Sequence, residues 1–210
     1  SRARLTGGHP DDPLVVYAGR VSFEKRVDVL ADVATRLAGR ARLAVVGEGP
    51  ALGWLKDKLA GTDTVFTGFL DGDELSEAYA SGDVFAFPSD SETLGFAAIE
   101  AMAAGVPVVA AEAGGIPHIV HHERTGLLVP AGDAEATTDA ILRLLDDASL
   151  RRALAVNGRE EAERWSWLAA TESLVDRYRQ ALRVHRVSAA RRTGQPPTGT
   201  ATASHAPSRM

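Results

Sequence analysis

The sequence contains no cysteine among its 210 residues, which excludes disulfide bonds and thiolate-bound metal sites. It also lacks an uninterrupted apolar run of about 18 residues, the shortest length expected of a membrane-spanning helix. The best candidate, residues 96–111, is broken by Glu100, Gly105 and Pro107. Residues 1–12 have no apolar segment of the kind found in signal peptides, and the chain does not start with methionine. We therefore expect a cytoplasmic protein without transmembrane helices, and a segment of a longer chain.

Acidic side chains are absent from the end of the chain, where residues 177–210 contain seven arginines. The formal net charge of the whole chain is −5, so this end carries +7 and residues 1–176 carry −12. A body this acidic argues against binding to nucleic acid, which needs a basic surface. We expect residues 187–210 to form a disordered basic tail. The alternative is a peripheral contact of this tail with anionic lipid at the inner face of the membrane.

Short apolar runs alternate along the chain with segments of helical periodicity, and this alternation predicts a parallel sheet with helices on both faces. The expected strands are residues 13–19, 41–47, 64–68, 84–87, 107–111 and 126–130. The expected helices are residues 26–38, 50–60, 71–81, 95–104, 133–147, 149–164 and 168–186. The sequence thus predicts an α/β domain over residues 13–186, with a doubly wound, six-stranded, Rossmann-like parallel sheet and C-terminal helices. Residues 1–12 are expected to be a linker.

Polar residues that follow the first and fourth strands are expected to share one crevice. In the common doubly wound strand order these two strands are neighbours, and ligands bind outside their carboxyl ends. The segment after the first strand contains Arg20 and Lys25, and the segment after the fourth contains Glu92. Arginine offers a forked set of donors and lysine a mobile point charge, a combination suited to a diphosphate. The alternative is a solvent-exposed pair, but lysine is rare in this chain, with only three present.

Two carboxylates frame the helix expected after the fourth strand. Glu92 precedes its start near Gly95, and Glu100 lies about one and a half turns inside it. A helix N-terminus attracts an anion through its unpaired N–H groups and partial positive charge. Carboxylates on either side can accept hydrogen bonds from hydroxyls attached to that anion. A diphosphate that joins a sugar to a ribose has this arrangement of groups.

The stretch from Glu92 to Val109 resembles the donor-binding signature of the family 4 retaining glycosyltransferases. The resemblance rests on the Glu-x7-Glu spacing, on Leu94-Gly95 inside it, and on the sequence EAMAAGVPVV that starts at Glu100. It extends from Leu14 to about Leu182. Enzymes of that family have two Rossmann-like domains, the GT-B fold. The resemblance implies that this chain is the second, donor-binding domain and that the first domain, which holds most of the acceptor site, is missing from it.

The resemblance also implies a role for individual residues. Arg20 and Lys25, after Gly19, match the family's phosphate-binding pair. Glu92 matches the residue that faces the transferred sugar, and Glu100 the residue that binds the ribose hydroxyls. The remaining donor-binding positions are expected to be Gly47, Gly68, Phe69 and Leu70 around the base, and Leu94 and Gly95 at the diphosphate.

Three features that suggest other ligands are discounted. The Gly47-Glu48-Gly49 turn follows a strand as in dinucleotide-binding folds, but the third glycine of that fingerprint is replaced by Leu52. Asp71-Gly72-Asp73 has the spacing of a metal-binding motif, but we interpret it as the N-cap of a helix. His118, His121 and His122 are interpreted as polar surface rather than metal ligands. The family implies no metal requirement, so we expect neither a metal nor a cofactor beyond the nucleotide-sugar.

Within the family, residues 72–95 and 113–117 resemble the sulfoquinovosyltransferases, which use UDP-sulfoquinovose and diacylglycerol. We therefore expect a domain that binds a nucleotide-sugar, with UDP as the nucleotide, for transfer to an acceptor hydroxyl such as that of a lipid. Two alternatives remain: a GT-B nucleotide-sugar epimerase, and a non-catalytic nucleotide-binding module. Release of sugar product without an acceptor would distinguish the first alternative.

The helix expected at residues 168–186 has an apolar face and is expected to cross to the missing domain.

Overall fold

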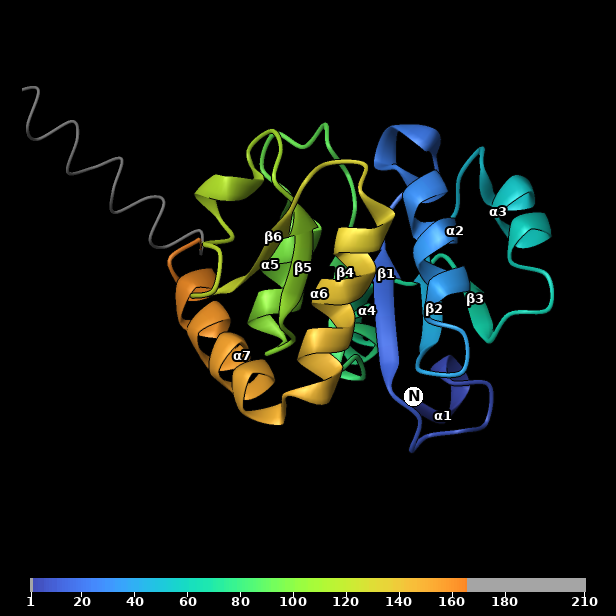
Figure 1. Cartoon of the computed structure of the whole chain (residues 1–210), viewed down its shortest axis with the longest axis horizontal. Helices are drawn as coiled ribbons and strands as arrows, with labels where there is room; N and C mark the ends of the chain where they lie inside the picture. Colours follow the sequence, from blue (N-terminus) through green and yellow to red (C-terminus); the bar gives the residue numbers. More distant parts are fainter. Residues whose placement is uncertain (1, 166–210) are drawn as a thin grey trace, which may run out of the picture. The chain divides into compact units, whose positions relative to one another are not determined.

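The sheet of the protein consists of six parallel strands, and the computed structural model describes residues 2–165 of the chain (Figure 1). The strands are β1 (Leu14–Ala18), β2 (Arg42–Val46), β3 (Thr64–Gly68), β4 (Val84–Phe87), β5 (Val108–Ala111) and β6 (Gly126–Val129). Their order in the sheet is β3-β2-β1-β4-β5-β6. This arrangement confirms the predicted doubly wound fold and places β1 beside β4, where the chain reverses its direction across the sheet.

Helices follow the strands close to where the sequence predicts them. They are α1 (Arg2–Leu5), α2 (Val27–Arg36), α3 (Leu52–Lys58), α4 (Gly72–Ala80), α5 (Phe96–Ala103), α6 (Ala134–Asp146) and α7 (Ala148–Glu163), with short 3-10 helices η1 (Phe23–Lys25) and η2 (Ile116–His118). The helix predicted at residues 168–186 and the tail predicted at residues 187–210 lie outside the described residues.

Both faces of the sheet are buried at its centre, where every residue of β1, β4 and β5 is buried, which explains why these strands are continuous apolar runs rather than alternating ones. The edge strand β3 is only partly buried. In β1, Val15 and Tyr17 join a core that includes α2, α3 and α6, whereas Leu14 and Val16 join a second core with α4 and α5. All five residues of this strand are buried. Figure 1 shows the resulting three layers, with α2 and α6 in front of the sheet and α4 and α5 behind it.

The segment predicted as a linker contains the short helix α1, which packs against the domain. Leu5 is only 1% exposed and joins the second core. The Arg2 guanidinium donates to a carboxylate oxygen of Asp83 at 2.7 Å and to the carbonyl of Asp12 at 2.8 Å. A four-residue helix has too few residues to show a periodicity, and its anchor lies 81 positions away, so local sequence does not reveal it.

Candidate functional site

Two adjoining cavities open above the carboxyl ends of β1 and β4. The first has a volume of about 400 Å³ and the second about 340 Å³. Both are lined by Ala18, Gly19 and Ala97, so they form one crevice with a common middle. The crevice therefore lies at the topological switch point of the sheet, where ligands of this fold class bind.

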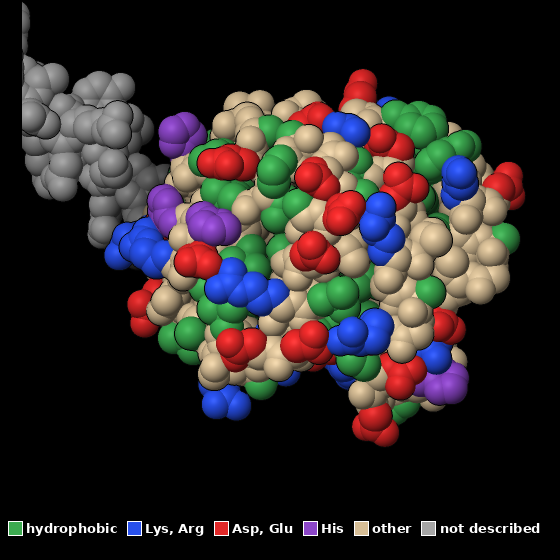
Figure 2. All heavy atoms as spheres, viewed as in Figure 1, with side chains coloured by type: hydrophobic (Ala, Val, Ile, Leu, Met, Phe, Trp, Pro, Cys, Tyr) green, Lys and Arg blue, Asp and Glu red, His purple; other side chains and the backbone are tan. Residues whose placement is uncertain are grey.

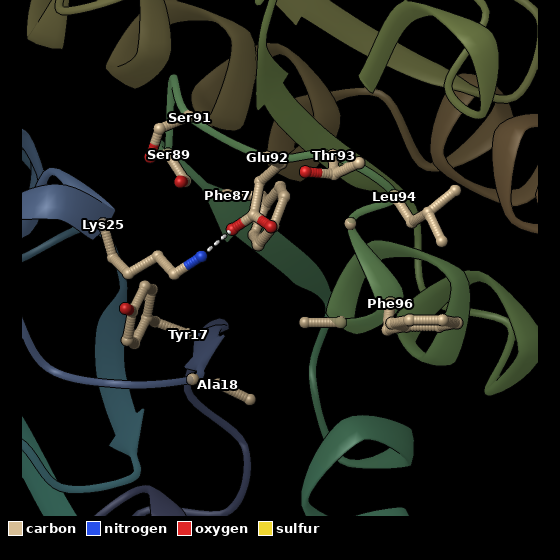
Figure 3. A pocket seen from close by; sticks show the side chains of 13 residues that line it. Tyr17, Ala18, Lys25, Phe87, Ser89, Ser91, Glu92, Thr93, Leu94 and Phe96 are labelled. Atoms are coloured by element: carbon tan, nitrogen blue, oxygen red, sulfur yellow. Dashed lines mark hydrogen bonds and ion pairs between the residues drawn. The ribbon is translucent and has the colours of Figure 1, made fainter. Parts of the chain in front are cut away.

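An ion pair between the two crevice loops dominates the first cavity. The Lys25 ammonium donates to a carboxylate oxygen of Glu92 at 2.5 Å. Figure 3 shows the two side chains approaching each other across the cavity from the β1 and β4 sides. The Glu92 side chain is 14% exposed and the Lys25 side chain 30% exposed. Burial, and to a lesser extent the charge of Glu92, raises the pKa of Tyr17 well above its ordinary value, so this phenol stays protonated at neutral pH.

The loop that carries Glu92 is held from two sides. On the β1 side, the Arg26 guanidinium donates to Asp90 at 2.7 Å and the Ser91 hydroxyl donates to the carbonyl of Glu24 at 3.0 Å. On the opposite side, the backbone N–H of Gly115 donates to the carbonyl of Glu92 at 2.7 Å. These contacts fix the loop that carries the Glu92 carboxylate before any ligand arrives, which is the preorganisation that a binding site requires.

The second cavity contains a tyrosine–carboxylate pair between α4 and α5. The hydroxyl of the buried Tyr79 donates to one oxygen of Glu100 at 2.8 Å. Burial and this hydrogen bond raise the pKa of Tyr79 well above its ordinary value, so the hydroxyl remains a donor. Arg20 and Phe69 also line this cavity, and Phe69 is 69% exposed. The arrangement presents a positioned carboxylate, a cation and an aromatic face to the same space.

The N-terminus of α5 faces the first cavity. Leu94, Gly95 and Phe96 line it, and the helix has no acidic residue in its first turn. The N-cap residue, Gly95, has a φ of 62°, a conformation that glycine adopts without strain. The first N–H groups of the helix have no intrahelical acceptors, so they are suited to an anion bound in the crevice.

The structure brings together nearly all of the residues predicted for the site. Those that line the two cavities are Gly19, Arg20, Lys25, Gly47, Phe69, Leu70, Glu92, Leu94, Gly95 and Glu100. Gly68 is the exception: it lines neither cavity, and its carbonyl accepts from the N–H of Gly47 at 2.8 Å. Tyr17, Ser89 and Tyr79 also line the cavities, although no sequence motif marks them. Tyr17 lies in an apolar strand and Tyr79 near the end of a mixed helix, and in neither case does the pattern distinguish a site tyrosine from a core residue.

The aspartates and histidines considered as metal ligands in the sequence do not form a metal site in the structure. Within residues 2–165 no three or more His, Asp or Glu side chains are grouped as a metal site would need. Asp71 is at the N-cap of α4 as predicted, but its side chain accepts no capping hydrogen bond, so that part of the interpretation is wrong. His122 instead accepts a hydrogen bond from the N–H of Leu128 at 3.1 Å. The expectation of metal-free activity remains a prediction.

Comparison with known proteins gives the family. The pattern of the family described as "Glycosyl transferases group 1" matches residues 12–147. This chain is a group 1 glycosyltransferase sequence. A sulfoquinovosyl transferase from Arabidopsis thaliana is 46% identical over 176 residues, which cover 82% of the chain. A D-inositol 3-phosphate glycosyltransferase from Saccharomonospora viridis is 38% identical over 205 residues, 89% of the chain.

Solved glycosyltransferase structures share the fold. Sucrose-phosphate synthase from Thermosynechococcus elongatus superposes with a TM-score of 0.73 at 34% identity, over 83% of this chain and 47% of that one. Anabaena HepE, in complex with UDP and glucose, superposes with a TM-score of 0.75 at 21% identity, over 86% of this chain and 53% of that one. The group 1 chain spans 34% of the Arabidopsis relative and 47% of the Saccharomonospora relative. Among the described residues, no helix meets the length and apolarity needed to cross a bilayer.

A substitution at Arg26 separates backbone strain from side-chain contacts in this group 1 domain. Arg26 has a φ of 54° and forms ion pairs with Asp28 and Asp90. Arg26→Gly removes the strain of a left-handed backbone conformation, which stabilises the domain, and it also removes both ion pairs, which destabilises it. Because the two effects oppose each other, we expect the free energy of unfolding to change by less than about 1 kcal/mol. Arg26→Ala removes the pairs and keeps the strain, and should be about 1 kcal/mol less stable than the glycine variant. Urea unfolding measures both, and equal stability of the two variants would contradict the strain argument.

Proposed function

We propose that this chain is the donor-binding domain of a retaining group 1 glycosyltransferase that uses a UDP-sugar. The observation that supports it is the pair of adjoining cavities joined at Gly19. One contains the Lys25–Glu92 ion pair and the other contains Glu100 with a positioned donor, Tyr79. A nucleotide-sugar has its transferred sugar and its ribose on opposite sides of a diphosphate, so it matches this division.

In this proposal the domain stabilises the negative charge that grows on the leaving diphosphate. Arg20, Lys25 and the N–H groups at the start of α5 surround the middle of the crevice. Donors fixed where charge develops lower the barrier because they need no reorganisation during the reaction. Glu92 orients the transferred sugar. For the sugar to reach the Glu92 carboxylate, the Lys25 ammonium shifts from that carboxylate toward the phosphate. No metal ion is needed for this arrangement.

Glu100 is proposed to bind the ribose. A carboxylate only accepts hydrogen bonds, and Tyr79 already donates to one of its oxygens. The other oxygen remains able to accept from a ribose hydroxyl. The exposed ring of Phe69, in the same cavity, is suited to contact the base.

The acceptor is proposed to be the hydroxyl of a lipid such as diacylglycerol. The support is the likeness to the Arabidopsis protein, whose name is sulfoquinovosyl transferase. The relatives have more than half of their length outside the matched region, and we propose that a first GT-B domain there provides the acceptor site. A cytoplasmic location with a peripheral contact at the inner face of the membrane would bring such a domain to its acceptor.

The proposal predicts that the chain binds UDP or a UDP-sugar and that Glu100→Ala weakens this binding. Loss of the ribose partner should cost about 1–3 kcal/mol, because buried hydroxyls are left unpaired. Isothermal titration calorimetry with UDP, GDP, ADP and their sugars measures the effect and identifies the base. Glu135→Ala is the matched control, since Glu135 is exposed on α6 and lines neither cavity. Equal affinity of Glu100→Ala and the parent would contradict the ribose assignment, and no binding of any nucleotide would overturn the proposed function.

A further inference from the structure

Ser89 is a buried residue of the first cavity that the chemistry described so far does not use. It follows β4, is 1% exposed and lines the cavity. Its hydroxyl has no hydrogen-bond partner among the described residues. In Figure 3 this hydroxyl is turned toward the side of the cavity on which Lys25 and Glu92 meet. The neighbouring Ser91 differs, because its hydroxyl is engaged with the carbonyl of Glu24.

A buried hydroxyl without a hydrogen-bond partner lowers the stability of the fold, so its presence in a cavity suggests that a ligand supplies the partner. Buried polar side chains have a partner in the large majority of cases, and a hydroxyl without one loses the solvation that it has in the unfolded chain. Among the described residues only Ser22 shares this condition. Ser22 lines neither crevice cavity, whereas Ser89 lines the first. The difference points to a ligand atom as the partner of Ser89.

The place of Ser89 in the crevice indicates which part of the ligand it meets. The base and ribose side is lined by Phe69 and Glu100, which do not line the first cavity. Ser89 is on the opposite side, with an ammonium that only donates and a carboxylate that only accepts. A serine hydroxyl both donates and accepts, which matches the hydroxyl of a sugar.

We propose that the Ser89 hydroxyl hydrogen-bonds a hydroxyl of the transferred sugar and so helps to determine which sugar the domain accepts. This inference rests on the proposed function, because it requires a nucleotide-sugar in the crevice. It adds a specificity-determining residue to the positions that the sequence motifs identify. It also predicts that Ser89 contributes to binding of the sugar and not of the nucleotide.

The test compares the parent chain with Ser89→Ala and Ser22→Ala by calorimetry. For each protein, the dissociation constant of the nucleotide-sugar that the parent binds best is divided by that of the matching nucleoside diphosphate. In Ser89→Ala this ratio should rise by about three- to tenfold, the loss expected for one hydrogen bond, with the diphosphate affinity unchanged within about twofold. Ser22→Ala removes the other unpaired hydroxyl and should leave the ratio unchanged. Thermal unfolding of both variants verifies that each is folded.

The outcomes separate the two proposals. An unchanged ratio in a folded Ser89→Ala variant that still binds the diphosphate would overturn the role of Ser89 and leave the proposed function standing. An equal loss of affinity for the diphosphate and the nucleotide-sugar would place Ser89 at the phosphate and also overturn the inference. Absence of nucleotide binding by the parent would overturn the proposed function and this inference with it. If Ser89→Ala does not fold, Ser89→Thr, which keeps the hydroxyl and adds a methyl group, should change the sugar preference.

Discussion

Replacement of Lys25 by alanine is expected to lower the turnover number of a two-domain enzyme that contains this domain by about 10²–10³-fold. The ammonium lies at 2.5 Å from Glu92 at the edge of the proposed diphosphate position. Its removal takes a positive charge from the place where negative charge develops, and it also frees the Glu92 carboxylate. Arg20→Ala should have an effect of similar size, because Arg20 lines the other side of the same crevice. Steady-state kinetics at saturating donor measures both.

Lys56→Ala is the control for this experiment. Lys56 is one of the three lysines of the chain and lies over the ring of Phe66 at 5.7 Å, away from both cavities. The Lys56→Ala substitution removes one positive charge, as Lys25→Ala does, but leaves the crevice unchanged, so the turnover number should stay near that of the parent. Near-parental turnover of both Lys25→Ala and Arg20→Ala would show that the phosphate assignment is wrong.

Replacement of Gly47 by alanine is expected to destabilise the domain by about 2–6 kcal/mol. A Cβ atom at this position would lie 2.0 Å from the carbonyl oxygen of Gly19, which is backbone and cannot move aside cheaply. The φ of Gly47 is 127°, a conformation that residues with a side chain rarely adopt. Overpacking and backbone strain each cost about 1–3 kcal/mol. Because Gly19 and Gly47 both line the crevice, nucleotide affinity should fall as well.

Gly53→Ala is the matched control for the stability experiment. Gly53 lies in α3, and a Cβ atom there would meet no heavy atom within 4 Å. Alanine is the better helix former, so this variant should be as stable as the parent or more stable by up to about 1 kcal/mol. Urea unfolding gives both free energies. A Gly47→Ala variant as stable as the parent would mean that the β1 and β2 loops are not held as close as described.

The fold was predictable because its signals are local and repeated. Most strands of this sheet are short apolar runs that end at a turn, as in β1 and β2. The longer helices, such as α2, show a helical periodicity, whereas α1 is too short to show one. The position of the crevice follows from strand order alone, which is why Arg20, Lys25 and Glu92 were expected together and lie around it. Element ends agree within one or two residues, since α5 was expected at residues 95–104 and spans Phe96–Ala103.

The features that the sequence did not reveal depend on contacts between distant segments. Tyr79 donates to Glu100 from a different helix, and this pairing is visible only once α4 and α5 are packed. The left-handed conformation of Arg26 has no sequence signal, because it is glycine that usually marks such a position. In the sequence, Ser89 looks like an ordinary turn residue after a strand. Only its burial beside the first cavity distinguishes it from the other serine of that turn.

The strand order has a consequence for the biogenesis of the protein. Within the described sheet, the segment that forms β1 to β3 and the segment that forms β4 to β6 meet at the pairing of Val15 with Val84 and Val16 with Phe85. While the chain emerges from the ribosome, β1 has a bare edge until β4 has been synthesised, and bare edges invite pairing with other chains. The crevice lies at this junction between β1 and β4, which forms only after β4 has been synthesised. A substitution that weakens the β1–β4 junction should therefore reduce the yield of native protein in the cell as well as nucleotide affinity.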